Sequence, residues 1–199
     1  MDDAITMVPA NEASRDDLAV IFGTTGDPAT CQCQWFKIPR ADWRAVPREE
    51  LESRLREQTN CGHPAAPTTS GIVAYLGGEP VGWCAVESRA EYVRLRQMRI
   101  PWAGRAEDRD DDRIFAVTCF VVRKGFRKRG ISRALAAATV DFARERGASA
   151  VEAYPMTTEP GKEVIWGQLF VGSVGIFEDA GYSEVSSPTP RRRVMRIDF

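Results

Sequence analysis

The sequence predicts a single α/β domain, in which a mixed sheet of about six to seven strands is flanked by about four helices. Short apolar segments rich in β-branched residues alternate with amphipathic segments of helical period along its 199 residues. No internal repeat, linker or low-complexity tract divides residues 1–199, and this length suits one ordinary domain with its own core.

The charge balance and the cysteine content narrow the class of protein. Charged residues make up 28% of the chain and the net charge is −1, so no overall field attracts nucleic acid or a membrane surface. No apolar run approaches the ~18 residues of a membrane helix, and residues 1–10 do not resemble a signal peptide. Five cysteines predict reduced thiols. We expect a cytoplasmic protein, and its arginine- and alanine-rich composition is typical of a GC-rich bacterial genome.

The first third of the chain predicts one strand and two helices. Residues 4–10 form a short strand, and Asn11 caps a helix over 12–22. The turn-rich stretch 23–41 precedes a second amphipathic helix over 47–58, with a proline at its entry and acidic residues in its first turn.

A hairpin follows over 71–88, turning at Gly77-Gly78. Residues 89–113 are rich in arginine and aspartate, which predicts a long solvated loop. A buried strand is expected next over 114–122, followed by a helix over 131–147 that ends at Gly147 and a strand over 148–154. After a loop over 155–168 we expect a helix over 169–181 and two closing strands over 182–187 and 192–199.

A basic turn, FRKRGIS at 126–132, joins the strand 114–122 to the following helix. The first amides of a helix lack intrahelical partners and carry partial positive charge, and a glycine lets a phosphate come close to them. This turn is therefore a candidate anion site. The alternative is a plain strand–turn–helix connection with solvated cations, because neither a Walker loop nor GxGxxG is present.

The surroundings of this turn resemble the GCN5-related N-acetyltransferase (GNAT) superfamily, in which a strand of the type VxPxxRxxGxG/A leads into a helix. Val122, Phe126, Arg127 and Gly130 match this motif, whereas Lys124 replaces its proline. A small residue, serine, stands at the second Gly/Ala position, and the tail FEDAGYSEV is similar to the helix-to-strand ending of the family. The resemblance covers nearly the whole chain.

The resemblance implies a sheet splayed at its central strands and acetyl-CoA as cosubstrate. It assigns the acetyl carbonyl and the pantetheine arm to backbone amides of the central strand, and the pyrophosphate to the basic turn. The residues implied are Phe120, Val121, Val122, Arg127, Lys128, Arg129, Gly130, Ile131 and Ser132.

The usual acid and base of the superfamily do not carry over. The position of the common tyrosine is Phe177, that of the asparagine is Val171, and that of the glutamate of the histone-modifying branch is Ala116. The residues that donate and accept protons must therefore be sought elsewhere in the chain.

Four residues are candidate substitutes. Tyr154 ends a strand that flanks the expected acetyl site, and alternation places Glu152 on the same face. Ser173 is a second candidate near the sulfur, and Glu87 is a candidate base acting through water. The alternatives are a packed aromatic for Tyr154, a solvated charge for Glu87, and an amine that loses its proton to solvent.

The cysteines are expected to pack rather than to react or to bind metal. Cys119 lies on the central strand, but nucleophilic cysteine needs a base and the single histidine, His63, is remote in sequence. CxC at 31–33 and CGH at 61–63 have poor spacing for zinc, so we expect no metal. We expect this cysteine cluster, with Trp35 and Phe36, to pack between the first two helices; the resemblance also places Trp35 beside the acceptor pocket.

The sequence thus predicts an acetyl-CoA-dependent N-acetyltransferase acting on a primary amine, of a small molecule or a protein, by direct attack. The acidic run at 107–113 would attract a cationic acceptor such as a polyamine, or is simply solvated. A non-catalytic acyl-CoA-binding sensor or interaction module is the alternative, and a nucleotide-binding regulatory domain is disfavoured. We expect no nucleic-acid or membrane partner, and a homodimer is one option.

Overall fold

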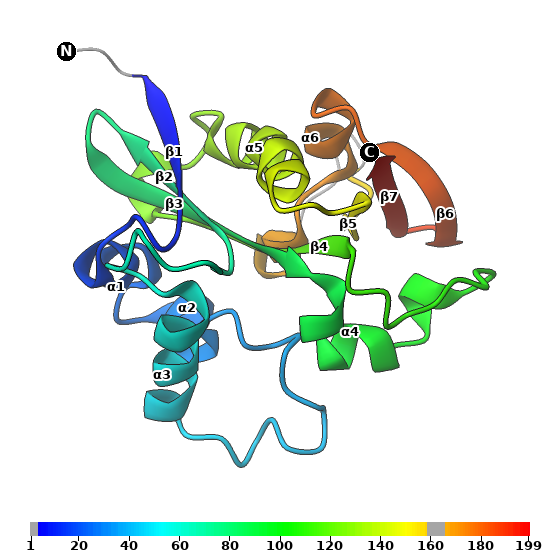
Figure 1. Cartoon of the computed structure of the whole chain (residues 1–199), viewed down its shortest axis with the longest axis horizontal. Coiled ribbons are helices and arrows are strands. Elements are labelled where there is room, and N and C mark those ends of the chain that lie inside the picture. The colour runs from blue at the N-terminus through cyan, green and yellow to red at the C-terminus, as the bar shows by residue number, and fades with distance from the viewer. Residues whose placement is uncertain (1–3, 159–165) are drawn as a thin grey trace.

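The computed structural model describes residues 4–158 and 166–199, and its centre is one seven-stranded sheet of order β1-β2-β3-β4-β5-β7-β6 (Figure 1). Neighbouring strands are antiparallel, except that β4 and β5 are parallel. The strands are β1 Ile5–Pro9, β2 Ile72–Leu76, β3 Glu79–Ser88, β4 Ile114–Val122, β5 Ala150–Ala153, β6 Ser183–Thr189 and β7 Arg192–Asp198. This arrangement confirms the predicted mixed α/β class.

Helices lie on both faces of the sheet (Figure 1). The α-helices are α1 Arg15–Phe22, α2 Gly26–Cys31, α3 Arg48–Thr59, α4 Val93–Gln97, α5 Ile131–Glu145 and α6 Val174–Asp179. Short 3₁₀ turns are η1 Arg89–Glu91, η2 Ile100–Trp102, η3 Lys124–Phe126 and η4 Trp166–Val171. None of these helices is long and apolar enough to cross a membrane, over the residues described.

The sheet opens between β4 and β5, which confirms the predicted splay. The last pair of these strands is Val117 with Ala153, whereas β4 runs on to Val122 paired only with β3. A bulge lies at the opening, because Ala85 pairs with Cys119 but the next residue of β3 pairs with Val117, leaving Thr118 as the extra residue. We call this opening the fork.

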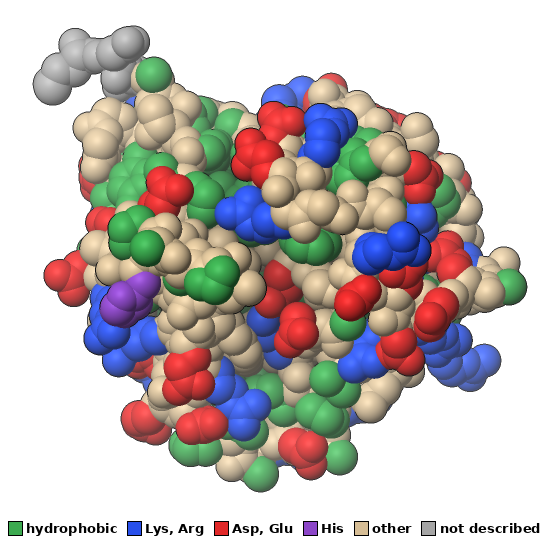
Figure 2. All heavy atoms as spheres, in the orientation of Figure 1, with side chains coloured by type: hydrophobic (Ala, Val, Ile, Leu, Met, Phe, Trp, Pro, Cys, Tyr) green, Lys and Arg blue, Asp and Glu red, His purple; other side chains and the backbone are tan. Residues whose placement is uncertain are grey.

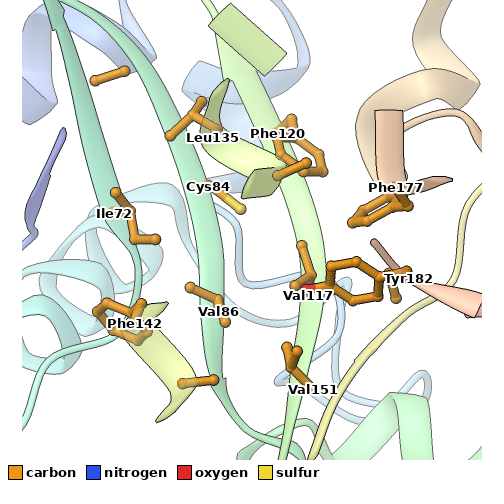
Figure 3. Close-up of a cluster of buried hydrophobic side chains, with 14 of the residues drawn as sticks. Ile72, Cys84, Val86, Val117, Phe120, Leu135, Phe142, Val151, Phe177 and Tyr182 are labelled. Carbon is orange, nitrogen blue, oxygen red and sulfur yellow. The ribbon is translucent and has the colours of Figure 1, made fainter. Parts of the chain in front are cut away.

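On one face, α5 and α6 cover the sheet and bury an apolar cluster (Figure 3). Leu135 of α5 packs over β2 and β3, and Phe120 of β4 meets Phe177 of α6 edge to face, with ring centroids 5.8 Å apart. Phe177 also meets Tyr182 at 5.1 Å. The burial of these aromatic side chains stabilises the packing of α6 against the open side of the fork.

Two further clusters lie away from that core. One packs Trp83 and Val121 of the sheet against Leu18 of α1 and Leu55 of α3. The other surrounds Ala116 of β4 and is formed by Phe36, Tyr92, Leu95, Tyr154, Met156, Val171 and Val194. The second cluster brings the segment before α3, the β3–β4 connection and β7 together next to the fork.

The N-terminal helix is capped by Ser14 rather than by Asn11. The Ser14 hydroxyl accepts from the Asp17 amide at 3.0 Å and the Asp17 carboxylate accepts from the Ser14 amide at 3.1 Å, a capping box. Asn11 is buried and its amide donates to the Pro64 carbonyl. The stretch 23–41, predicted as turns, contains the short helix α2.

The predicted solvated loop over 89–113 is wrong for its first part, because η1, α4 and η2 fold residues 89–102 against the sheet. Residues 103–113 contain no helix or strand and are mostly exposed, as expected. Tyr92, Leu95 and Trp102 are buried in the folded part, and the Arg89 side chain is fully buried. The Trp102 indole lies beneath Arg89, with the guanidinium carbon 4.9 Å from the ring centroid. Some of the arginines that suggested solvation are thus packed and paired, whereas Arg99, Arg109 and Arg113 are exposed as expected.

The helix expected over 169–181 is broken at Gly172, which has φ +81° and separates η4 from α6. Of the loop expected over 155–168, residues 159–165 lie outside the described part of the chain. The hairpin, the strand 114–122 and the helix from 131 are confirmed, and β6 extends through Ser187-Pro188-Thr189 of the expected SPTP separator.

Gly172 provides a test of this packing. A Cβ there would lie 2.8 Å from Phe177 Cε2 and 3.1 Å from Phe120 Cε2, at a left-handed φ. We expect Gly172→Ala to lower the free energy of unfolding by about 1–3 kcal/mol. Gly175→Ala, in open space within α6, should leave it unchanged or raise it by up to about 1 kcal/mol. Equal urea midpoints for the two variants would contradict this view of the break.

Candidate functional site

The basic turn forms an open N-terminus for α5. Gly130 is the N-cap residue with φ +81°, and no atom lies within 4 Å of a Cβ built there. The first turn of α5 holds no acidic residue and no side chain caps it, so its leading amides lack helix partners. Ser132 is in this first turn and Ile131 is buried beneath it. The arrangement suits an anion approaching the backbone.

Cations surround this helix end. Arg127 and Lys128 are exposed, and within the described part of the chain no carboxylate pairs with either. Arg127 Nε lies 3.3 Å from the Val122 carbonyl oxygen, and Arg129 lies over the Phe126 ring at 5.7 Å. Charges of both signs are interspersed over the face seen in Figure 2. Anion attraction is therefore a local property of this turn.

The fork places the predicted backbone residues next to that turn. Beyond Val117, the β5-facing edge of β4 has no strand partner, and this edge includes Phe120, Val121 and Val122. Its peptide groups are positioned to bind an extended ligand as an added strand would. Ser173 is half-buried at the start of α6, where its backbone bridges to Met156 just beyond β5.

A largely apolar cavity of about 130 Å³ lies on the other side of the fork. Five of its lining residues belong to the cluster that surrounds Ala116 of β4, namely Phe36, Leu95, Tyr154, Val171 and Val194. Because the resemblance places Trp35 beside the acceptor, we call this cavity the acceptor pocket, and that role is an expectation. Its lining residues are Trp35, Phe36, Leu95, Met98, Ile100, Pro101, Tyr154, Phe170, Val171, Pro188, Arg192, Arg193 and Val194.

The structure joins Tyr154 to Glu152, as predicted. The Tyr154 hydroxyl donates to Glu152 Oε2 at 2.8 Å, and both side chains are buried. Burial, followed by the Glu152 charge, raises the pKa of Tyr154 well above its usual value. This phenol is consequently a protonated hydrogen-bond donor at neutral pH.

Three arginines occupy the same Glu152 carboxylate, and the sequence analysis missed them. Arg89 Nη1 lies 3.3 Å from Oε2, Arg196 Nη1 lies 3.2 Å from Oε1, and Arg105 also pairs with it. Glu107 bridges the same guanidinium groups. With its oxygens engaged by arginines and Tyr154, Glu152 is a fixed anion of a buried network.

The acidic run at 107–113 is only partly paired, because Asp108 and Asp112 are exposed and have no ion pair among the described residues. Although burial opposes it, hydrogen bonding and charge from Arg105 hold the pKa of Glu107 below its usual value. Asp110 pairs with Arg96 and Asp111 lies 3.6 Å from Arg113. Attraction for a cationic acceptor and simple solvation both stay predictions for this run.

Glu87 lies on β3 directly opposite Ala116 of β4 and is not a solvated strand end. It forms an ion pair with Lys37, and the Ser70 hydroxyl donates to its Oε1 at 2.8 Å. Both members of the pair are largely buried. Lys37 was missed by sequence reasoning, because it approaches Glu87 from a segment 50 residues earlier in the chain (87 − 37).

Two buried hydroxyls at the fork were also missed. Tyr92 is fully buried and Thr118 is the bulge residue. Burial and then the Glu87 charge raise the pKa of Tyr92, and the neighbouring Thr118 hydroxyl opposes the shift. Neither residue had a sequence signal, since Tyr92 lies in the arginine-rich stretch and a bulge depends on register.

The cysteines pack as expected only in part. Cys33 joins Leu18 and Leu55 between the first two long helices, and its sulfur accepts from the Trp83 indole at 3.1 Å. Burial and then Cys119 raise the pKa of Cys33 well above normal. Trp35 and Phe36 instead line the acceptor pocket. Over the described residues, no group of three potential ligands is placed to hold a metal ion.

Removing the Glu152 carboxylate tests the buried network. Glu152→Ala would leave three guanidinium groups without their shared anion, so we expect a loss of about 3–5 kcal/mol in the free energy of unfolding. The matched control is Glu50→Ala, whose exposed ion pair with Arg54 should contribute less than about 1 kcal/mol. Chemical denaturation of both variants measures the difference, and a Glu152→Ala loss no larger than the control would refute the network's role.

Comparison with solved structures gives the fold. The chain matches a GCN5-related N-acetyltransferase from Kribbella flavida with a TM-score of 0.54 and 16% identity, over 98% of each chain. It matches a GNAT-family acetyltransferase from Streptococcus pneumoniae with a TM-score of 0.53 and 12% identity, over 98% of this chain and 100% of that one. A search of curated proteins finds no match.

Comparison with family models gives the relationship. The model described as "Acetyltransferase (GNAT) family" matches residues 34–161, more than half of the chain. The match includes β4, the fork, the basic turn and β5. The chain therefore belongs to the GNAT family of acetyltransferases, whose acetyl donor is acetyl-CoA.

Proposed function

We propose that this protein transfers the acetyl group of acetyl-CoA directly to a primary amine. The observation that carries the proposal is the fork, because its unpaired β4 edge leads from the acceptor pocket to the basic turn. In the net reaction the amine nitrogen bonds to the acetyl carbonyl carbon and the carbon–sulfur bond breaks. Its electron pair leaves with sulfur, and one amine proton is released.

The residues at the donor end fit acetyl-CoA. The open helix end at Gly130 and the cations Arg127 and Lys128 match a pyrophosphate in charge and shape. The free peptide groups of β4 at Phe120–Val122 match the amides of a pantetheine arm. In this assignment Arg129, Ile131 and Ser132 contribute through the turn and the first helical amides.

The acceptor pocket itself favours the neutral amine. A free alkylammonium has a pKa of ~10.4, and an apolar environment disfavours its charged form. The described lining of the pocket contains no carboxylate that would stabilise the ammonium. We therefore assign amine deprotonation to desolvation and solvent. Glu87 remains a candidate to receive the proton through water, with Lys37 holding its carboxylate.

Tyr154 is the donor that we assign to the departing sulfur, in place of the hydroxyl missing at Phe177. It lines the acceptor pocket, and its single hydroxyl hydrogen is held by Glu152. For the transfer, this hydrogen bond breaks, the hydroxyl turns to the sulfur, and solvent later returns a proton to the phenolate. The charges of Arg89 and Arg105 favour its ionised form and so partly offset the loss of its proton. Glu152 acts in this assignment as a positioning residue, and Ser173 at the start of α6 is the second candidate donor.

A non-catalytic acyl-CoA sensor is the second candidate function. It is favoured by Phe177, which is fully buried between Phe120 and Tyr182 and leaves no hydroxyl at the usual position. The two functions differ in one observable, the release of free thiol in the presence of amines. Acetyl-CoA binding without thiol release from any amine would select the sensor.

The role of the basic turn is tested with Arg127→Ala. Losing one charged hydrogen-bond partner should weaken acetyl-CoA binding by about 1.5–3 kcal/mol, roughly tenfold or more. Arg144→Ala, an exposed cation near the other end of α5, is the matched control and should bind normally. Calorimetric titration with acetyl-CoA, 3′-dephospho-CoA and ATP provides the measurement. Unchanged affinity in Arg127→Ala would remove this residue from the site.

The role of Tyr154 is tested with Tyr154→Phe. A missing proton donor should lower kcat by about a hundredfold while the affinity for acetyl-CoA stays the same. Tyr75→Phe is the control, because it removes a hydroxyl that bonds to Asp17 and lies on β2, three strands away from β5 in the sheet. Wild-type turnover in Tyr154→Phe would clear this residue of the acid role.

A further inference from the structure

The arginines of β7 differ in their pairing. Alternation places Arg192, Val194 and Arg196 on the face of the sheet that holds Glu152 and Tyr154. Arg196 is paired with Glu152, Glu107 and Asp198. Within the described residues, by contrast, no carboxylate pairs with Arg192.

Arg193 does not share this property. Its Nε lies 2.9 Å from Glu184 Oε2 on the neighbouring strand β6, so its charge is balanced within the fold. Arg191, one residue earlier, is exposed and donates to Gln168 at 2.7 Å. Arg192 is thus singled out as a cation in the pocket wall whose charge the described part of the fold leaves uncompensated.

The surroundings of Arg192 make that charge costly. It is half-buried in a pocket whose other walls are mainly apolar. Burial lowers its pKa, and the charge of Arg191 lowers it further. A partly desolvated guanidinium is stabilised when a carboxylate binds it in a bidentate geometry. The pocket is consequently prepared for an anionic group.

The rest of the pocket suits an apolar body. Phe36 and Phe170 lie with ring centroids 6.1 Å apart, and Trp35 contributes a ring that is 40% exposed. Leu95 and Val171 complete an aliphatic wall. A polycation would meet Arg192 and Arg193 here with no described carboxylate among the lining residues.

We propose that the acceptor is a primary amine that also carries a carboxylate and an apolar side chain, of the apolar amino-acid class. Its carboxylate pairs with Arg192, its side chain lies among Trp35, Phe36 and Phe170, and its amine is directed toward Tyr154 and the fork. The inference rests on the proposed function, since it names the acceptor of that same site.

The test uses pairs of amines that differ only in the carboxylate. L-phenylalanine is compared with phenethylamine and L-leucine with isopentylamine, with spermidine as the polycation. We expect the carboxylated member of each pair to have at least a tenfold higher kcat/KM. Arg192→Gln should raise the KM of L-phenylalanine by about tenfold to a hundredfold and leave that of phenethylamine unchanged. Arg191→Gln should behave as wild type.

Calorimetric binding of the same amines to the CoA-loaded protein separates this inference from the function on which it rests. Three results together would support the inference even without turnover. L-phenylalanine or L-leucine binds, its carboxyl-free partner binds at least tenfold more weakly, and this difference is lost in Arg192→Gln. Acetylation without a preference for the carboxylate would overturn the inference and keep the acetyltransferase. Failure of both carboxylated amines to bind, or a preference that survives in Arg192→Gln, would also overturn it.

Discussion

Hydrogen bonding between β4 and β5 ends at Val117 and Ala153, and both halves of the site depend on that ending. Each peptide group left without a strand partner needs another partner or solvent. Past the bulge at Thr118, β4 keeps β3 on one side and offers the other side to a ligand. The same strand then delivers the chain to the N-terminus of α5. One interrupted ladder thus leaves an open strand edge and aligns it with the basic turn, the two features on which the proposed function rests.

The buried ionic network fixes the acceptor side of the fork. Glu152 on β5 meets Arg196 on β7, Arg89 in η1 and Arg105 beyond η2, so one carboxylate ties four segments together. Burying these charges is costly, and the cost is offset only while each has its partners. This dependence favours a single arrangement of the β3–β4 connection. The position of this connection in turn determines the shape of the acceptor-pocket wall.

The elements with local signals could be predicted from the sequence. The strand 114–122 reads as a continuous apolar run, and the hairpin has Gly77-Gly78 at its turn, both with φ above 50°. The stretch 89–113 could not be predicted, because its arginines are solvated or buried according to partners elsewhere in the chain. Arg105 and its partner Glu152, for example, are 47 residues apart.

The candidate site likewise combines contacts that the sequence predicts with contacts that it does not. Strand alternation correctly joined Tyr154 to Glu152, a contact between residues two positions apart. It gave no indication of the arginines that occupy Glu152, or of Lys37 beside Glu87. The break at Gly172 was also hidden, because a glycine within an apolar helical pattern is compatible with an unbroken helix.

Backbone groups make up most of one end of the fork, whereas side chains make up the other end. In the proposed function the donor end relies mainly on peptide groups of β4 and α5, which every residue except proline supplies, with added charge from Arg127 and Lys128. Side-chain replacements away from these cations should therefore leave its chemistry in place. The acceptor pocket is made of side chains from five separate stretches, near residues 35, 98, 154, 170 and 192. Such walls change by single substitutions or loop exchanges without disturbing the donor end. If the proposed function holds, substitutions in the pocket walls can therefore change the acceptor while acetyl-CoA remains the donor.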